Sequence, residues 1–175
     1  MHRFSELVDN CTAVTLEALR QANERSLEAL QTSAATPLVK ALQMIQLQKA
    51  ITAVGMFSLF EAILQDGLKC RDGFRQAEEI LKGDGEMDLK ERFVDMQLAV
   101  NVLKHGRGRS YDALVAKADW LPFRIKLPGE ALSFEGDVSE IETLIEVDDA
   151  FVLNCSGVIR QVSDSLQKTQ PGFLG

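Results

Sequence analysis

The sequence predicts an all-α fold: an up-and-down helical bundle of four long helices plus one or two short ones, with a small β-hairpin insertion before the last helix. Three observations lead to this prediction. Apolar residues recur with a helical period over most of the chain, capping residues precede several of these segments, and one stretch alternates apolar and polar residues. We expect the 175 residues to form a single helical domain, residues 1–175.

The first two helices are predicted to be long. Apolar residues over 4–30 repeat every three or four positions, with polar residues between them. Thr36 and Pro37 are typical of an N-cap and a first helical residue, and Gly67 can act as the C-cap of the same helix. Because this second helix is apolar on more than one face, we expect it to be the central core element.

The middle of the chain is predicted to hold a short helix followed by a long one. The short helix is expected over residues 72–82. Asp88, with Glu91 three residues later, matches a capping box for the next helix, which is expected to run to His105. The buried stripe of that long helix is predicted to be Leu89, Phe93, Met96, Val100 and Leu103.

A short helix and the hairpin are expected between the glycine loop and the last helix. Ser110 can cap the short helix. The hairpin insertion is expected at about residues 121–136. Its alternating apolar residues are Phe123, Ile125 and Leu127 on one strand and Leu132 and Phe134 on the other. Asp137 and Glu140 then predict the start of the last helix, whose apolar stripe begins at Ile141.

The composition limits the classes of function. A net charge of −7 and a pI near 4.9 argue against a protein that coats nucleic acid with its whole surface, so any such contact must be local. The three cysteines, Cys11, Cys70 and Cys155, have no spacing typical of a disulfide framework or a zinc site. The sequence therefore indicates no metal site and no cofactor, and it favours a reducing compartment.

The N-terminus and the longest apolar stretch indicate no membrane anchor. The first eleven residues, "MHRFSELVDNC", lack the apolar region of a signal peptide. The stretch over residues 50–64 is interrupted by Glu61 and is shorter than the roughly 20 residues that span a bilayer. We therefore expect a cytoplasmic protein that does not bind membranes.

The segment "AVNVLKHGRGRSYDAL" holds the candidate site. Gln97, Asn101 and His105 lie on one helical ridge. The most concentrated positive charge in the chain follows directly, and the candidate ligand-binding residues are Lys104, His105, Arg107, Arg109 and Tyr111. Tyr111 and Trp120 are aromatic surfaces on which a base could stack. The alternative interpretation is structural, because basic residues in a last turn complement the helix dipole and Gly106 is a common C-cap.

Two stretches of the chain resemble the HEPN superfamily, the higher eukaryotes and prokaryotes nucleotide-binding domains. They are "FSLFEAIL" in the second helix and "NVLKHG" at the end of a later one. The signature of that family is Arg-Asn-x-x-x-His near the end of a helix. Asn101 and His105 match its Asn and His, and Lys104 to Gly106 looks like the "KHG" of many members. Val100 occupies the place of the family's arginine.

The resemblance implies metal-independent RNA cleavage at a dimer cleft in active members. Arginine stabilises the charge that develops on phosphate, and histidine moves a proton as the 2′-OH attacks. Valine supplies no cation, and Arg107 and Arg109 lack the fixed geometry of a helix position. The resemblance therefore implies a HEPN-like homodimer, of a bacterial defence or toxin–antitoxin type, that binds its ligand without efficient catalysis.

Three functions remain open at this point. The first is a binding module for RNA, a nucleotide or a protein partner that acts through the basic loop. The second is a metal-independent endoribonuclease, in which His105 and Asn101 are the catalytic residues. The third is a helical scaffold or regulatory protein with no small-molecule site, whose acidic faces contact other proteins.

Overall fold

The computed structural model describes residues 3–33, 35–130 and 141–173, which form six α-helices and one short 3-10 turn. The elements are α1 (Phe4–Leu30), α2 (Thr36–Gly67), α3 (Gly73–Gly83), α4 (Met87–His105), α5 (Arg109–Val115), η1 (Ala118–Trp120) and α6 (Asp149–Thr169). The predicted all-α fold is confirmed. The four long helices are α1, α2, α4 and α6.

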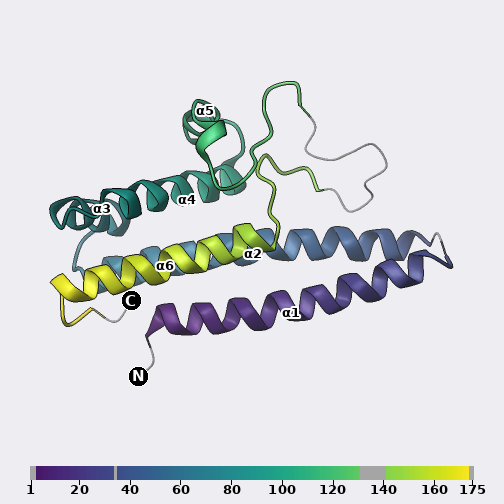
Figure 1. Cartoon of the computed structure of the whole chain (residues 1–175), viewed down its shortest axis with the longest axis horizontal. Coiled ribbons are helices and arrows are strands. Elements are labelled where there is room, and N and C mark those ends of the chain that lie inside the picture. The colour runs from purple at the N-terminus through teal and green to yellow at the C-terminus, as the bar shows by residue number, and fades with distance from the viewer. Residues whose placement is uncertain (1–2, 34, 131–140, 174–175) are drawn as a thin grey trace.

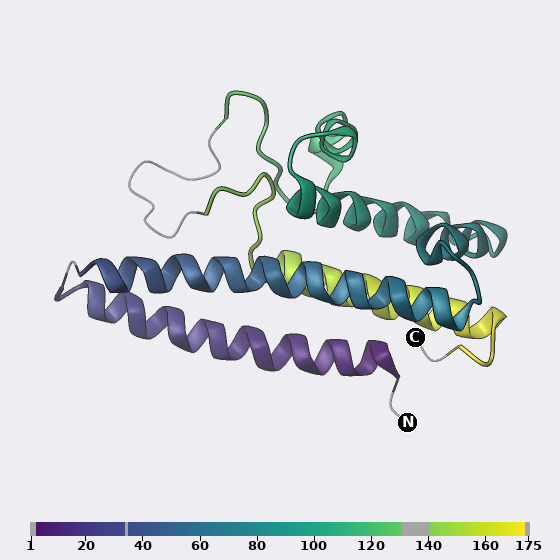
Figure 2. The same ribbon diagram turned by 180° about the vertical axis from the view of Figure 1, so that it is seen from behind.

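The long helices alternate in direction, as in an up-and-down bundle (Figure 1). α1 contacts α2 and α6, whereas α4 contacts these two helices from the opposite side and also carries α3 and α5. α6 lies beside the C-terminal half of α2, so the C-terminal end of α1 and the N-terminal end of α2 extend beyond α6 (Figure 2). The loop after α4 and the start of α5 therefore lie on the opposite side of the bundle from α1.

Four phenylalanines form the centre of the core between α2, α3 and α4. The ring of Phe93 on α4 lies 6.1 Å from that of Phe60 and 6.4 Å from that of Phe57, both on α2. Phe74 on α3 meets Phe93 edge to face at 5.5 Å. Phe57, Phe60 and Phe93 are fully buried, so this aromatic cluster supplies much of the apolar area that attaches α4 to the bundle.

Three of the predicted helix starts are displaced. Thr36 and Ser110 were expected as N-caps, but Ala35 and Gly108 occupy those positions and neither helix has a side-chain cap. The predicted capping box is wrong, because α4 begins at Met87 and Asp88 lies within its first turn. There the Asp88 carboxylate still complements the positive end of the helix dipole.

The predicted β-hairpin is not supported. Ile125 forms a single antiparallel bridge with Ile145, and the Lys126 amide donates to the Leu144 carbonyl at 2.8 Å. Within the described part of the chain, the first expected strand thus pairs with residues 144–146. The expected second strand, with Leu132 and Phe134, lies outside the described residues.

The last helix begins later than predicted. Asp148 is the N-cap of α6, and its carboxylate accepts a hydrogen bond from the Phe151 amide at 2.7 Å. Before it, Ile145 and Val147 are buried and Glu146 is exposed, which is the period of an extended segment rather than a helix. Asp137 and Glu140, the expected caps, lie outside the described residues.

The length and composition of α2 would also allow it to cross a membrane. It contains an 18-residue window with a mean hydropathy of 1.4, a third of which is buried. The core helix of a soluble protein meets the same criterion. α2 contacts α1, α3, α4 and α6, so its position in the core accounts for its buried apolar residues, while Met44, Leu47, Ile51 and Leu59 are exposed.

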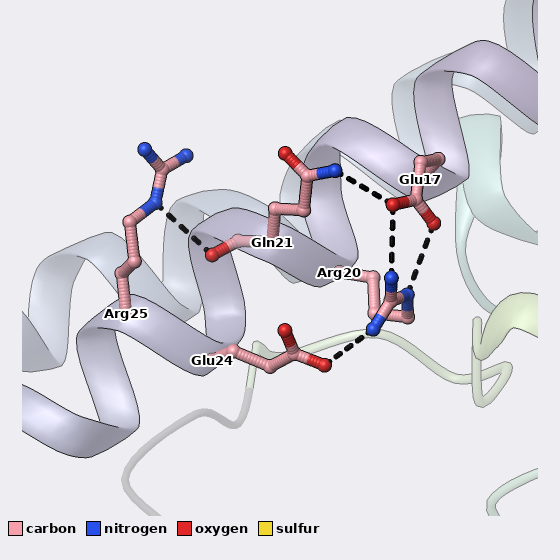
Figure 3. Close-up of polar contacts among 5 residues, drawn as sticks. All are labelled: Glu17, Arg20, Gln21, Glu24 and Arg25. Atoms are coloured by element: carbon pink, nitrogen blue, oxygen red, sulfur yellow. Dashed lines mark hydrogen bonds and ion pairs between the residues drawn. The ribbon is translucent and has the colours of Figure 1, made fainter.

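The outer face of α1 carries a chain of polar contacts (Figure 3). The Arg20 guanidinium donates to both carboxylate oxygens of Glu17, at 3.0 and 2.8 Å, and also pairs with Glu24. The hydrogen bond from Arg20 holds the pKa of Glu17 below its usual value. Exposed ion pairs of this kind contribute little to stability. They keep this face of α1 polar and do not hold the helix in place.

We predict that Gly73→Ala destabilises the protein, whereas Gly83→Ala does not. A Cβ at Gly73 would lie 2.7 Å from the Leu64 Cβ and 2.8 Å from the Glu61 carbonyl, where α3 meets α2. We expect a loss of about 1–3 kcal/mol in the free energy of unfolding, measured by urea denaturation. At Gly83 no atom lies within 4 Å of the added Cβ, so this control should change stability by less than about 1 kcal/mol.

Candidate functional site

The basic loop, residues 104–109, connects α4 to α5. α4 ends at Gly106, whose φ of 72° and ψ of −142° favour glycine, and whose amide donates to the Val102 carbonyl at 2.8 Å. α5 begins three residues later at Arg109, and the Asp112 amide donates to the Gly108 carbonyl at 2.9 Å. The connection is therefore short, and it holds the cationic residues close together.

The charged side chains of the basic loop are exposed to solvent. Lys104 and His105 form the basic last turn of α4, where the charge of Lys104 complements the helix dipole. In the described ranges of the chain, none of the ion pairs involves the exposed residues Lys104, His105, Arg107 and Arg109. The charges of the loop are thus accessible to a ligand.

Arg107 is held against Tyr111. The Arg107 Nη1 atom donates to the Tyr111 hydroxyl at 3.3 Å, and the guanidinium carbon lies 5.0 Å from the centre of the tyrosine ring. This geometry is that of a cation–π contact. Tyr111 itself is only 3% exposed, so its ring supports Arg107 from below and offers no open face for base stacking.

Tyr111 also links the basic loop to the extended segment before residue 130. Its hydroxyl donates to the Lys126 carbonyl at 2.7 Å, and the neighbouring residue Ile125 is the one that pairs with Ile145. Lys126 is half-buried and lies in none of the ion pairs among the described residues. Sequence reasoning missed Lys126, because only the folded chain brings it beside Tyr111.

An ion pair also stabilises the same segment. The Arg124 guanidinium donates to Glu130 at 2.8 Å, and the Leu127 amide donates to the other carboxylate oxygen at 3.2 Å. Both contacts hold the pKa of Glu130 below its usual value, and the hydrogen bond from Arg124 has the larger effect. Glu130 therefore stays charged at neutral pH and is occupied by its own neighbours.

Asn101 and His105, the two residues that match the HEPN signature in sequence, both lie on α4. Asn101 is half-buried and His105 is exposed, one helical turn further on. Val100, in place of the arginine, is 4% exposed and packs in the core. Position 100 of α4 therefore does not place a cation with fixed geometry beside His105.

Trp120 lies apart from Tyr111. It ends η1 with 87% of its surface exposed, whereas a position packed at the edge of the core would be more usual for such a residue. Its neighbours are the buried Asp95 and the Lys117 that pairs with it.

None of the groups of His, Cys, Asp and Glu within the described ranges is close enough to hold a metal ion.

We predict that Tyr111→Phe lowers the free energy of unfolding by about 1–2 kcal/mol, because the half-buried Lys126 carbonyl loses its hydrogen-bond donor while the ring volume is kept. Urea denaturation of both proteins measures the difference. Arg109→Ala, which removes an exposed side chain, serves as the control and should change stability by less than about 0.5 kcal/mol. Equal stability of Tyr111→Phe and the unmodified protein would refute this role of the hydroxyl.

Comparison with known proteins assigns no family to this arrangement. No family model matches the chain, and neither the curated proteins nor the solved structures searched contain a match. The resemblance to HEPN domains through Asn101, Lys104 and His105 stays a prediction.

Proposed function

We propose that this protein is a helical module that binds RNA through the basic loop. One observation carries the proposal: Lys104, Arg107 and Arg109 are exposed within six residues, and none of them is in an ion pair among the described residues. Phosphate groups are the ligands that such a cluster of cations binds.

The contact between Arg107 and Tyr111 supports this proposal. An arginine that is already held over a ring loses less side-chain entropy when it binds than a freely moving one. The glycines on both sides of Arg107 keep the backbone free of side chains, and a Cβ at Gly106 or Gly108 would meet no atom within 4 Å. A phosphate can therefore approach the loop closely.

The choice of RNA rests on the resemblance of Asn101, Lys104 and His105 to the HEPN signature. Binding is favoured over cleavage because Val100, in place of the signature's arginine, is buried. A transition state with extra charge on the phosphate needs a fixed cation. We also place the protein in the cytoplasm, where its three cysteines would stay reduced.

Self-association is the second part of the proposal. The hairpin of α1 and α2 exposes several large apolar side chains, among them Val14 at 72% and Met44 at 67%. A homodimer that covers these side chains would remove them from water. Two basic loops would then belong to one particle, which raises the affinity for a longer RNA.

We predict that the protein sediments as a dimer at micromolar concentration and that Val14→Glu with Met44→Glu converts it to a monomer. Both side chains are exposed, so the helical content measured by circular dichroism should not change. Met87→Glu, at a residue that is 52% exposed on α4, is the control and should leave the dimer intact. A monomer for the unmodified protein would contradict this part of the proposal without affecting the basic loop.

We predict that Arg107→Ala with Arg109→Ala weakens binding of a labelled oligouridylate by about tenfold or more at low salt. Three phosphate contacts give a slope of log affinity against log salt of about −2, and the variant should reduce it by more than half. Fluorescence anisotropy at several salt concentrations measures both quantities.

The matched control removes two arginines from distant sites. Arg25→Ala with Arg71→Ala has the same net charge as the loop variant, and both residues are exposed, so its affinity should equal that of the unmodified protein. Equal weakening in both variants would show that only the overall charge matters and would overturn the proposal. Cleavage of the RNA in the presence of a chelator, lost in His105→Ala, would favour the endoribonuclease instead.

A further inference from the structure

Trp120 is presented to solvent on an ordered turn. The residue is 87% exposed, while Leu121 and Phe123, which follow it, pack against the core. The Trp120 amide donates to the Lys117 carbonyl at 3.0 Å, which closes the turn. A large indole that faces water on a fixed backbone is a typical anchor of a binding surface.

The turn is attached to α4 by an ion pair. Lys117 pairs with Asp95, whose side chain is almost fully buried. Breaking such a pair leaves a buried charge without a partner, which is strongly destabilising. The attachment therefore fixes the backbone of the turn beside α4, and the indole, which has little contact with the protein, extends from it into solvent.

An open pocket of about 460 Å³ lies between α4 and this turn. The residues of its lining that carry charge or an aromatic ring are Asp88, Glu91, Arg92, Asp95, Lys117 and Trp120. Asp95 and Lys117 neutralise each other, and the Arg92 guanidinium donates to Gln161 at 2.8 Å.

The charges around the indole that have no ion-pair partner are mostly negative. Asp88 and Glu91 are exposed, and so is Asp119, the residue before Trp120. None of these three carboxylates is in an ion pair among the described residues. Arg92 lines the pocket and has no carboxylate partner among the described residues. The three unpaired carboxylates therefore outnumber this unpaired cation.

We propose that this pocket binds an arginine side chain from a basic segment of a partner protein. The indole face attracts a guanidinium by a cation–π contact, and the carboxylates of Asp88 and Glu91 accept its hydrogen bonds. Stacking of a nucleic-acid base on Trp120 would bring phosphates beside these carboxylates, which disfavours it. The site is independent of the basic loop, and the charge of −7 on the chain attracts a basic partner.

The experiment uses the full chain and a blocked pentapeptide in which two arginines alternate with glycines. The chain contains one tryptophan, so the tryptophan emission reports this site alone. We expect a saturable change in emission with the arginine peptide and none with the same peptide carrying citrulline, which is neutral and of similar size. An emission change caused by oligouridylate but not by the arginine peptide would overturn the proposal.

Calorimetry with variants tests the roles of the ring and the carboxylates. Trp120→Ala and the double variant Asp88→Asn with Glu91→Gln should each weaken peptide binding by about threefold to tenfold, and Trp120→Phe by less. Arg107→Ala with Arg109→Ala should bind the peptide as the unmodified protein does. Equal affinity of the unmodified protein and Trp120→Ala, or no binding up to about 1 mM peptide, would refute the site.

Discussion

The packing of Phe93 against Phe57, Phe60 and Phe74 is the contact on which both proposed surfaces depend. It attaches α4 to α2 and α3 through buried rings, and α5 and η1 are attached in turn to α4. The basic loop is the C-terminal end of that helix, and the pocket beside Trp120 lies along its first half. Loosening the aromatic cluster would therefore displace both surfaces together.

The opposite charges of the two surfaces follow partly from the helix dipole. Acidic Asp88 lies in the first turn of α4 and basic Lys104 and His105 in its last, which is the arrangement the dipole favours without any ligand. The dipole does not account for Arg107 held over Tyr111, or for Trp120 held outside the core. The contact of Arg107 with Tyr111 and the exposure of Trp120, rather than the signs of the charges, are the features that support the two proposed surfaces.

The sequence predicts correctly the helices whose apolar period is unbroken. It does not predict the segments whose conformation depends on tertiary contacts. Residues 4–30 match α1, and Phe93 and Val100 are buried as their spacing indicated. Ile145 has a helical spacing to the stripe that follows, yet it pairs with Ile125, because a single bridge leaves little trace in local sequence. Tyr111 follows the basic loop directly in sequence, but its burial and its hydrogen bond to the Lys126 carbonyl, fifteen residues away, could not be predicted from the local sequence.

The two surfaces share one support, which is the segment from Arg109 to Trp120. α5 is only seven residues long, and a helix of that length is not stable by its own propensity. It buries Tyr111 and Leu114, so contacts outside the helix are needed to hold it in place. The hydrogen bond of Tyr111 to Lys126 fixes one end of the segment, and the ion pair of Lys117 with Asp95 fixes the other. Because these anchors are separate, loss of one would disturb the nearer surface first. The proposed RNA site and the proposed arginine site can therefore lie at opposite ends of this short segment without competing for a ligand.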